Sequence, residues 1–160
     1  MPGVINRKFM ELAIKEARKN LKKGAPGGPF GACIIKGRQL LAVERNKVLI
    51  SDATSHAEIN AIREASRRIK NFDLSGCTIY STTEPCPMCF SAIHWARIKT
   101  IVYGTSIRDA KKIGFNELSI TNTGMKKIGK SRIKIYAGFM AEECRALFSD
   151  WDRLEHKKLY

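Results

Sequence analysis

The chain has 160 residues, the length of one domain that can bury about 70% of the surface of its unfolded chain. It is 44% hydrophobic, but no apolar run approaches the ~18 residues that cross a bilayer, and its N-terminal stretch is charged, so we expect a cytoplasmic protein without a signal peptide. The 29 Lys and Arg against 15 Asp and Glu leave a formal charge of +14, which would attract polyanions, although the basic residues are spread along the chain.

The first part of the chain predicts a helix and then a pair of strands. Asn6 is a possible N-cap, and the apolar residues after it recur at helical spacing until Gly24, which is expected to end the helix. The segment GAPGGPFG then breaks regular structure. The runs FGACIIK and QLLAVERNKV, at 30–36 and 39–48, are separated by a glycine turn and predict a strand pair.

The rest of the chain alternates predicted helices with short predicted strands. One helix is expected from near His56 to Ile69, and another over 85–98, where Pro87 suits the first turn. The last helix presents one apolar face, made by Cys144, Leu147, Phe148, Trp151 and Leu154. Strands are expected within 77–82, 99–104 and 132–138. This alternation predicts one layered α/β domain over residues 1–160, around a central mixed sheet.

Two short motifs together offer a set of metal ligands. His56 and Glu58 form the motif HAE, and thirty residues after His56 the motif PCPMC supplies Cys86 and Cys89. Zinc accepts imidazole nitrogen and thiolate sulfur, and a catalytic zinc site uses three protein ligands and leaves the fourth position to water. The sequence therefore predicts Zn²⁺ bound by His56, Cys86 and Cys89.

Glu58 is predicted to be the catalytic acid and base beside this metal. Residues two apart point to opposite sides of a helix, so His56 and Glu58 can serve one site only if the metal lies off the helix N-terminus. Cys86 and Cys89 are expected at a second helix start, where the dipole favours thiolate. A carboxylate there can accept a proton from metal-activated water and pass it to a leaving group, as in the zinc deaminases, whose signature is H-x-E with a later P-C-x-x-C.

Two other interpretations of the cysteines were weighed. In a structural zinc site, Cys77 would be the fourth ligand, but then Glu58 would have no role. A redox pair of Cys86 and Cys89 is disfavoured because such a motif usually accompanies no H-x-E. The odd number of cysteines, five, also disfavours a disulfide framework.

At these motifs the sequence resembles the cytidine deaminase-like superfamily, and within it the bacterial guanine deaminase branch. The matching stretches are GGPFGACIIK, NKV, SHAEINAIREA, TTEPCPMCFSAIHWARIKTIVYG, GFNE and the closing LFSDWDRLEHKKLY. The resemblance covers the chain from about residue 25 onward. It implies a three-layer α/β/α domain around a five-stranded sheet, and a homodimer in which the C-terminal segment, about 141–160, is exchanged between subunits.

The resemblance also implies roles in substrate binding for five residues. Asn46 would hydrogen-bond the purine, Glu117 would face its amino group or ring nitrogens, and Tyr160 would cap the pocket of the neighbouring subunit. Phe30 and Trp95 would line or stack on the ring. The branch commonly has GFDD where this chain has GFNE, so the acidic side chain differs in length.

Without the resemblance, simpler interpretations hold for the same residues. Asn46 is typical of a turn at a strand end, Phe30 and Trp95 of core aromatics, and Tyr160 of a frayed terminus.

The predicted activity is hydrolytic deamination of a free nucleobase, guanine to xanthine and ammonia. The alternatives are a tRNA adenosine deaminase, which the charge of +14 favours, and a cytosine or nucleoside deaminase of the same superfamily. A basic, zinc-stabilised binding module without activity is the alternative outside the enzymes.

Overall fold

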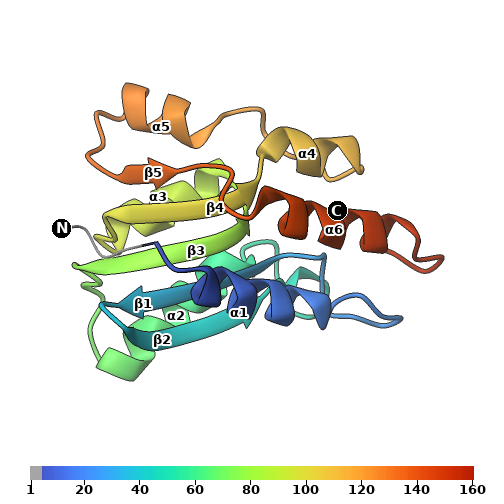
Figure 1. The fold of residues 1–160 in the computed structure, drawn as a ribbon, viewed down its shortest axis with the longest axis horizontal. Helices are drawn as coiled ribbons and strands as arrows, with labels where there is room; N and C mark the ends of the chain where they lie inside the picture. The colour runs from blue at the N-terminus through green and yellow to red at the C-terminus, as the bar shows by residue number, and fades with distance from the viewer. Residues whose placement is uncertain (1–4) are drawn as a thin grey trace.

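The computed structural model describes residues 5–160, so the first four residues of the predicted domain lie outside the described residues. Figure 1 shows a central sheet with α1 and α6 on one face and α2 and α3 on the other. In chain order the elements are α1 (Arg7–Arg18), β1 (Gly31–Lys36), β2 (Gln39–Arg45), the 3₁₀ turn η1 (Val48–Ile50), α2 (Ala57–Ile69), β3 (Cys77–Thr83), α3 (Pro87–Trp95), β4 (Thr100–Thr105), α4 (Ile107–Lys112), α5 (Asn122–Ile128), β5 (Lys134–Tyr136) and α6 (Ala141–Asp152). The predicted three-layer α/β/α fold is confirmed.

Local signals explain where the helices begin, and partly where they end. The side chain of Asn6 accepts a hydrogen bond from the backbone of Lys8, which confirms the predicted cap of α1. The helix ends at Arg18 and not at Gly24, which lies in the following loop. The last helix is also shorter than predicted, because α6 ends before Leu154.

Sequence periodicity missed α4 and α5. Both are short, with six and seven residues, so neither shows a full apolar period. Their caps were the available signal: the Ser106 side chain accepts from the backbone of Asp109 in a capping box, and Thr121 accepts from the backbone of Gly124. These two helices bridge β4 and β5, which run parallel and therefore need a crossover connection.

The five strands form one mixed sheet in the order β2-β1-β3-β4-β5. β1 pairs antiparallel with β2 and with β3, whereas β3, β4 and β5 are parallel. The carboxyl ends of β3 and β4 therefore meet at the same edge of the sheet. That is the edge at which β3 leads into α3.

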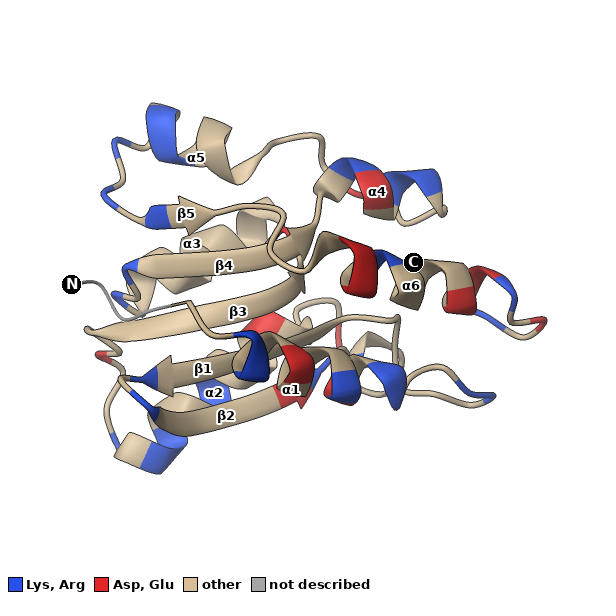
Figure 2. Cartoon of the chain, in the orientation of Figure 1, with Lys and Arg blue, Asp and Glu red and all other residues tan. Residues whose placement is uncertain are grey.

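Apart from the buried Glu58 and Glu84, charged side chains lie on the outside of the layers. Figure 2 shows Lys, Arg, Asp and Glu on α1 and α6, while β3 carries none. Ion pairs join the two helices across the outer surface, with Arg7 Nη2 at 2.7 Å from Glu143 Oε1 and Arg18 Nη1 at 2.9 Å from Asp150 Oδ2. Such exposed pairs each contribute about 0–1 kcal/mol, so the sandwich is stabilised chiefly by its core.

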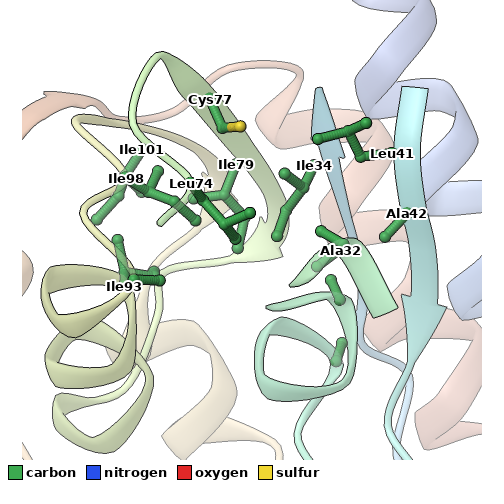
Figure 3. Packing of buried hydrophobic residues seen from close by; sticks show 14 of the residues in the cluster. Ala32, Ile34, Leu41, Ala42, Leu74, Cys77, Ile79, Ile93, Ile98 and Ile101 are labelled. Carbon is green, nitrogen blue, oxygen red and sulfur yellow. The ribbon is translucent and has the colours of Figure 1, made fainter. Parts of the chain in front are cut away.

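Two hydrophobic clusters lie on opposite faces of the sheet because side chains alternate along each strand. On β1, Ala32 and Ile34 belong to the cluster under α2 and α3, and Cys33 and Ile35 to the one under α1 and α6. Figure 3 shows Ile34 and Ile79 in the first of these clusters with Leu74 and Ile93. No helix of residues 5–160 has the length and hydropathy to cross a membrane.

Replacing Gly31 with Ala is expected to destabilise the fold by about 1–3 kcal/mol, the usual cost of overpacking. Here α1 crosses β1 so closely that an added Cβ would overlap the carbonyl oxygen of Ala13. Urea denaturation followed by circular dichroism measures the loss. The matched control is Gly124→Ala in α5, where the nearest atom to the added Cβ lies at 3.3 Å; an equal loss in both variants would contradict the packing argument.

Candidate metal centre and pocket

The predicted metal ligands sit at the starts of two helices. His56 is the N-cap residue of α2, with extended backbone angles (φ −66°, ψ 155°) and no capping hydrogen bond from its ring. Cys86 is the N-cap of α3 (φ −65°, ψ 168°), Pro87 is the first helical residue, and Cys89 lies in the first turn. Because His56 stands just before the helix and not within it, its ring and Glu58 can face the same point, as the sequence predicted.

The three ligand atoms are spaced as zinc requires. His56 Nδ1 lies 3.6 Å from Cys86 Sγ and 3.6 Å from Cys89 Sγ, and the three ligand atoms lie within 4.8 Å of one another. In a tetrahedral site with the usual bond lengths, a sulfur and a nitrogen ligand are about 3.5 Å apart. The residues therefore fit the metal without rearrangement.

One of the two thiols is already favoured as a thiolate, the form that binds a cation, and the other retains its proton. A hydrogen bond from Cys89, with help from His56, lowers the pKa of Cys86 to about 4 despite its burial. The same bond, together with burial, raises the pKa of Cys89 well above its usual value. Burial opposes the charged form of His56, but its hydrogen bond to Cys86 and the charge of Glu58 raise its pKa. A metal ion would displace these shared protons, so its binding is coupled to proton release.

Cys77 is not a fourth ligand. It is the first residue of β3, at the end of the strand opposite to the one that leads into Cys86. Seven residues of strand separate the two ends by about 20 Å. Because all five cysteines are free thiols and Cys77 packs in the core, the structure favours a site with three protein ligands.

Glu58 is held beside the ligands by a strand residue. Its side chain is buried, Oε1 accepts a hydrogen bond from Ser81 Oγ at 2.7 Å, and Oε2 lies 3.5 Å from Cys89 Sγ. Burial raises the pKa of Glu58, against the opposing charge of His56 and the Ser81 hydrogen bond. A carboxyl group with a raised pKa can both accept and release a proton near neutral pH.

A cavity of about 280 Å³ opens directly onto these groups. Its walls include Glu58 and four of the five residues assigned to the substrate from the resemblance, namely Phe30, Asn46, Glu117 and Tyr160. The volume lies at the lower end of the range for ligand pockets, about 300–1,000 Å³. The cavity therefore suits one small planar ligand.

Asn46 is fixed so that its amide faces this cavity. It is 1% exposed, and its Oδ1 accepts a hydrogen bond from the backbone of Val48 at 3.1 Å. Asn20 Nδ2 holds the backbone on both sides of the pocket, donating to the carbonyls of Asn46 and Gly28 at 2.9 and 2.8 Å. With Oδ1 engaged, the Nδ2 group of Asn46 is the donor that remains for a ligand.

The C-terminal residue closes the pocket of its own chain. The Tyr160 hydroxyl accepts a hydrogen bond from the backbone of Gly28 at 3.2 Å, and its carbonyl accepts one from Asn116 at 3.2 Å. Its ring packs edge-on against Phe115, with centroids 5.2 Å apart. The terminus is therefore not frayed, and Tyr160 reaches the pocket without a partner subunit.

Trp95 was predicted to line the same pocket, and within the chain it does not. It is the last residue of α3, nine residues after Cys86 and six after Cys89, so the length of the helix places it about 13 Å and about 9 Å from these two ligands along the axis. Its side chain is 77% exposed and borders a different hollow, between α3 and α5. Phe30 does line the pocket, in edge-on contact with Phe115 and with centroids 4.8 Å apart.

One residue that shapes the site was not predicted from the sequence. It is Glu84, which is 5% exposed and accepts hydrogen bonds from the backbones of Ile107 and Asn122 at 3.1 and 2.8 Å. It thus ties the starts of α4 and α5 to the segment that precedes Cys86. Only its position just before PCPMC could have indicated this role, because its partners are distant in sequence.

Comparisons with known proteins agree with this geometry. The family model for the cytidine and deoxycytidylate deaminase zinc-binding region matches residues 4–105. Guanine deaminase from Bacillus subtilis (strain 168) is 36% identical over 153 residues, which cover 95% of this chain and 97% of that protein. The tRNA-specific adenosine deaminase of Buchnera aphidicola subsp. Schizaphis graminum is 36% identical over 144 residues, covering 89% and 91%. A solved structure of guanine deaminase from Nitrosomonas europaea has a TM-score of 0.84 at 26% identity, covering 94% of this chain and 86% of that one.

Proposed function

Because the chain belongs to the family that carries the cytidine and deoxycytidylate deaminase zinc-binding region, we propose that it hydrolyses the amino group of free guanine, giving xanthine and ammonia. The observation that carries the proposal is the placement of Glu58 between the three metal ligands and a cavity of about 280 Å³ closed by Tyr160. A cavity of this small volume, with Tyr160 in its wall, favours a free base over a nucleotide within a polymer.

Each pocket residue has a task that follows from its contacts. The donor Nδ2 of Asn46 suits an acceptor atom on the edge of the base, and the rings of Phe30 and Phe115 supply an apolar wall. Tyr160 and the loop that bears Gly28 exclude water from the outer side.

Proton transfer is assigned to Glu58. Zinc, when bound by His56, Cys86 and Cys89, supplies an activated water by lowering its pKa to about 7. Glu58 would accept a proton at Oε2, the oxygen that Ser81 does not hold and that lies 3.5 Å from Cys89 Sγ. It would deliver this proton to the ring nitrogen when the water oxygen bonds to the ring carbon. A second proton, from the hydroxyl group that this addition leaves on the carbon, would then pass through Glu58 to the amino nitrogen, which leaves as ammonia when its bond to the carbon breaks. Ser81 holds Oε1 and so keeps the carboxyl group in one orientation throughout.

Glu117→Gln is expected to lower kcat/KM for guanine by about 10- to 100-fold, the usual effect of losing a hydrogen bond to a charged group. Burial, and secondly the charge of Cys86, raises the pKa of Glu117 to about 7. The ionised carboxylate accepts from the amino group of the base, so wild-type kcat/KM rises as the pH increases through about 7. The variant should lack this rise in a pH profile of ammonia release; Glu142→Gln, a surface change, is the control. An unchanged profile would exclude Glu117 from substrate binding.

A second candidate is deamination of adenosine in tRNA, favoured by the Buchnera relative and by the net charge of +14. The position of Tyr160 is the argument against it, because this residue narrows the pocket by its hydrogen bond with Gly28 and leaves less room for a base that is still attached to a polymer. Ammonia release from guanine, adenine, cytosine, guanosine, cytidine and unmodified tRNA, measured side by side, decides between them. Turnover of tRNA or cytosine with guanine inert would overturn the proposal.

Dimerisation with exchange of residues 141–160 is part of the proposal as well, together with a cytoplasmic location. Support for the location comes from the five free thiols, which suit a reducing compartment. The exchange requires the terminal segment to leave its own pocket, whose contacts at Gly28 and Asn116 a partner could make equally well. Sedimentation velocity tests the dimer, and disulfide trapping between introduced cysteines tests the exchange.

A further inference from the structure

Two adjoining hollows lie where α3 and α5 end, and neither shares a lining residue with the catalytic pocket. The larger, about 390 Å³, has four cationic residues in its wall, and the smaller, about 180 Å³, has Trp95. His94 and Ser131 line both hollows, so the two lie side by side. We call the following residues the basic–aromatic patch: Trp95, Arg97, Lys99, Lys130 and Arg132.

The fold brings these residues together from separate parts of the chain. β4 and β5 pair in parallel, and the backbone N–H of Lys134 donates to the carbonyl of Lys99 at 2.8 Å. Ile98 and Ile133 are buried beneath, so their neighbours Lys99 and Arg132 are left exposed side by side at the edge of the sheet. Figure 2 shows the cationic segments of α5, the following turn and the start of β5 at this edge.

Most of this charge is not neutralised by the protein. Among residues 5–160, Lys99, Lys130 and Arg132 form no ion pair, and Arg97 alone is paired, with Asp73 Oδ2 at 2.6 Å. Cations often stand near helix C-termini because of the helix dipole, which accounts for Arg97 and Lys130. It does not account for Lys99 and Arg132, which precede strands.

Aromatic rings accompany the charges. Trp95 is 77% exposed, although an indole is normally largely buried. Phe72 is also exposed, and the guanidinium carbon of Arg97 lies 5.1 Å from the centre of its ring. Proteins hold single-stranded nucleic acid by two features, exposed aromatic rings and unpaired cations. The cations contact the phosphates, and the rings stack on the bases.

We propose that the basic–aromatic patch binds single-stranded nucleic acid, with Lys99, Lys130 and Arg132 on the phosphates and Trp95 stacked on a base. A double strand hides its base faces and could not use Trp95. The catalytic pocket is separate, so the bound strand is not the substrate, and the proposal does not depend on the base that the enzyme deaminates.

The charge contribution is tested by fluorescence anisotropy with a labelled 20-nucleotide oligo(U) and with oligo(dT) of the same length. Three neutralised phosphates predict an affinity that falls about 20-fold from about 50 to about 200 mM salt, with a log–log slope of about −2. The triple variant K99Q/K130Q/R132Q should bind at least about tenfold more weakly and lose most of that slope. The control K8Q/K15Q/K22Q removes the same charge from α1 and the loop after it. Equal losses in both variants would overturn the patch, because binding would then follow net charge alone.

The stacking contribution has its own readout. Trp151 is 2% exposed, so a quench of tryptophan emission on adding oligo(U) reports Trp95, and Trp95→Phe identifies the share of that residue. Trp95→Ala should weaken binding by about 5- to 100-fold. Inorganic polyphosphate, which has no bases, should bind without the quench. If polyphosphate binds as tightly as oligo(U), the bases contribute nothing and the proposal is wrong. The proposal is also wrong if acrylamide fails to quench the emission of Trp95 in the free protein, because another copy of the chain then covers this residue.

Catalysis and binding separate cleanly in these variants. The triple variant should keep wild-type turnover of guanine, and Glu58→Gln should bind oligo(U) as tightly as wild type. If neither the wild type nor any of these variants turned over guanine, the proposed substrate would be refuted, and the proposal for the basic–aromatic patch would be unaffected. Absence of oligonucleotide binding by active enzyme would refute the patch alone.

Discussion

Glu58→Gln is expected to lower kcat for deamination by about 10²–10⁴-fold, the range attributed to general acid–base catalysis, and to leave the zinc content unchanged. Gln has the same shape and keeps an oxygen for the hydrogen bond from Ser81 Oγ, which lies 2.7 Å from Glu58 Oε1. It cannot carry the proton. Ammonia release measures the first quantity, and elemental analysis of the purified protein measures the second.

Glu64→Gln on the same helix is the matched control, because Glu64 lies on the outer side of α2 and pairs with Arg67. This control should retain full activity. If Glu58→Gln kept more than about a tenth of wild-type turnover, the proton carrier would have to be sought elsewhere, with Glu117 the next carboxyl group in the pocket. If it lost zinc, its role would be structural.

Cys86→Ser is expected to abolish both zinc binding and deamination. A serine hydroxyl is not ionised at neutral pH, whereas hydrogen bonds from Cys89 and His56 lower the pKa of the Cys86 thiol to about 4 and keep it ready for a cation. We expect zinc affinity to fall at least about 100-fold, since changes even beyond the ligands themselves cost about 10- to 100-fold. Competition with a chromophoric chelator measures the affinity.

The matched control is Cys77→Ser, which alters a core thiol at the far end of β3 and should leave zinc affinity unchanged. Zinc affinity of the wild type should also decrease as the pH falls, because Cys89, whose pKa is raised, must give up its proton to the solvent when the metal binds. Loss of zinc in Cys77→Ser would instead support a structural site in which Cys77 is the fourth protein ligand. A zinc affinity that does not change with pH would contradict the release of the proton shared by Cys86 and Cys89.

Removal of the metal by a chelator should therefore reproduce Cys86→Ser and differ from Glu58→Gln. The two helices whose N-terminal ends hold the ligands, α2 and α3, pack in the core on the same face of the sheet. Because that core does not require the metal to bring β1, β3 and β4 together, the apo protein should remain folded and regain activity when zinc is added.

The metal centre was predictable from sequence because its geometry is local. His56 and Glu58 lie at one helix start and Cys86 and Cys89 at another, and each start is set by signals within a few residues, such as Pro87 in the first turn of α3. Only the contact between the N-terminal ends of the two helices depends on the tertiary structure. The sequence already implied this contact, because one zinc ion needs ligands from both ends. The layers and the mixed five-stranded sheet followed from alternation and from the resemblance to known deaminases, whereas the order of the strands was not predicted.

The walls of the pocket were a different matter. Trp95 lies in the same short helix as the cysteines, yet the length of α3 carries it away from the pocket and onto the opposite end of the helix. Glu84 was overlooked, although it links α4 and α5 to the site, because backbone groups 23 and 38 residues away are invisible to any local pattern.

The sequence by itself determined the set of metal ligands, the position of Glu58 beside them and the class of fold, because helix caps, apolar periodicity and ligand chemistry act over short distances along the chain. Only the tertiary structure decided that Tyr160 lies against Gly28, and that Lys99, Lys130 and Arg132 gather beside Trp95. Those contacts join residues up to 132 positions apart, and their geometry depends on how β4, β5 and the C-terminal segment pack, which no local property of the residues fixes.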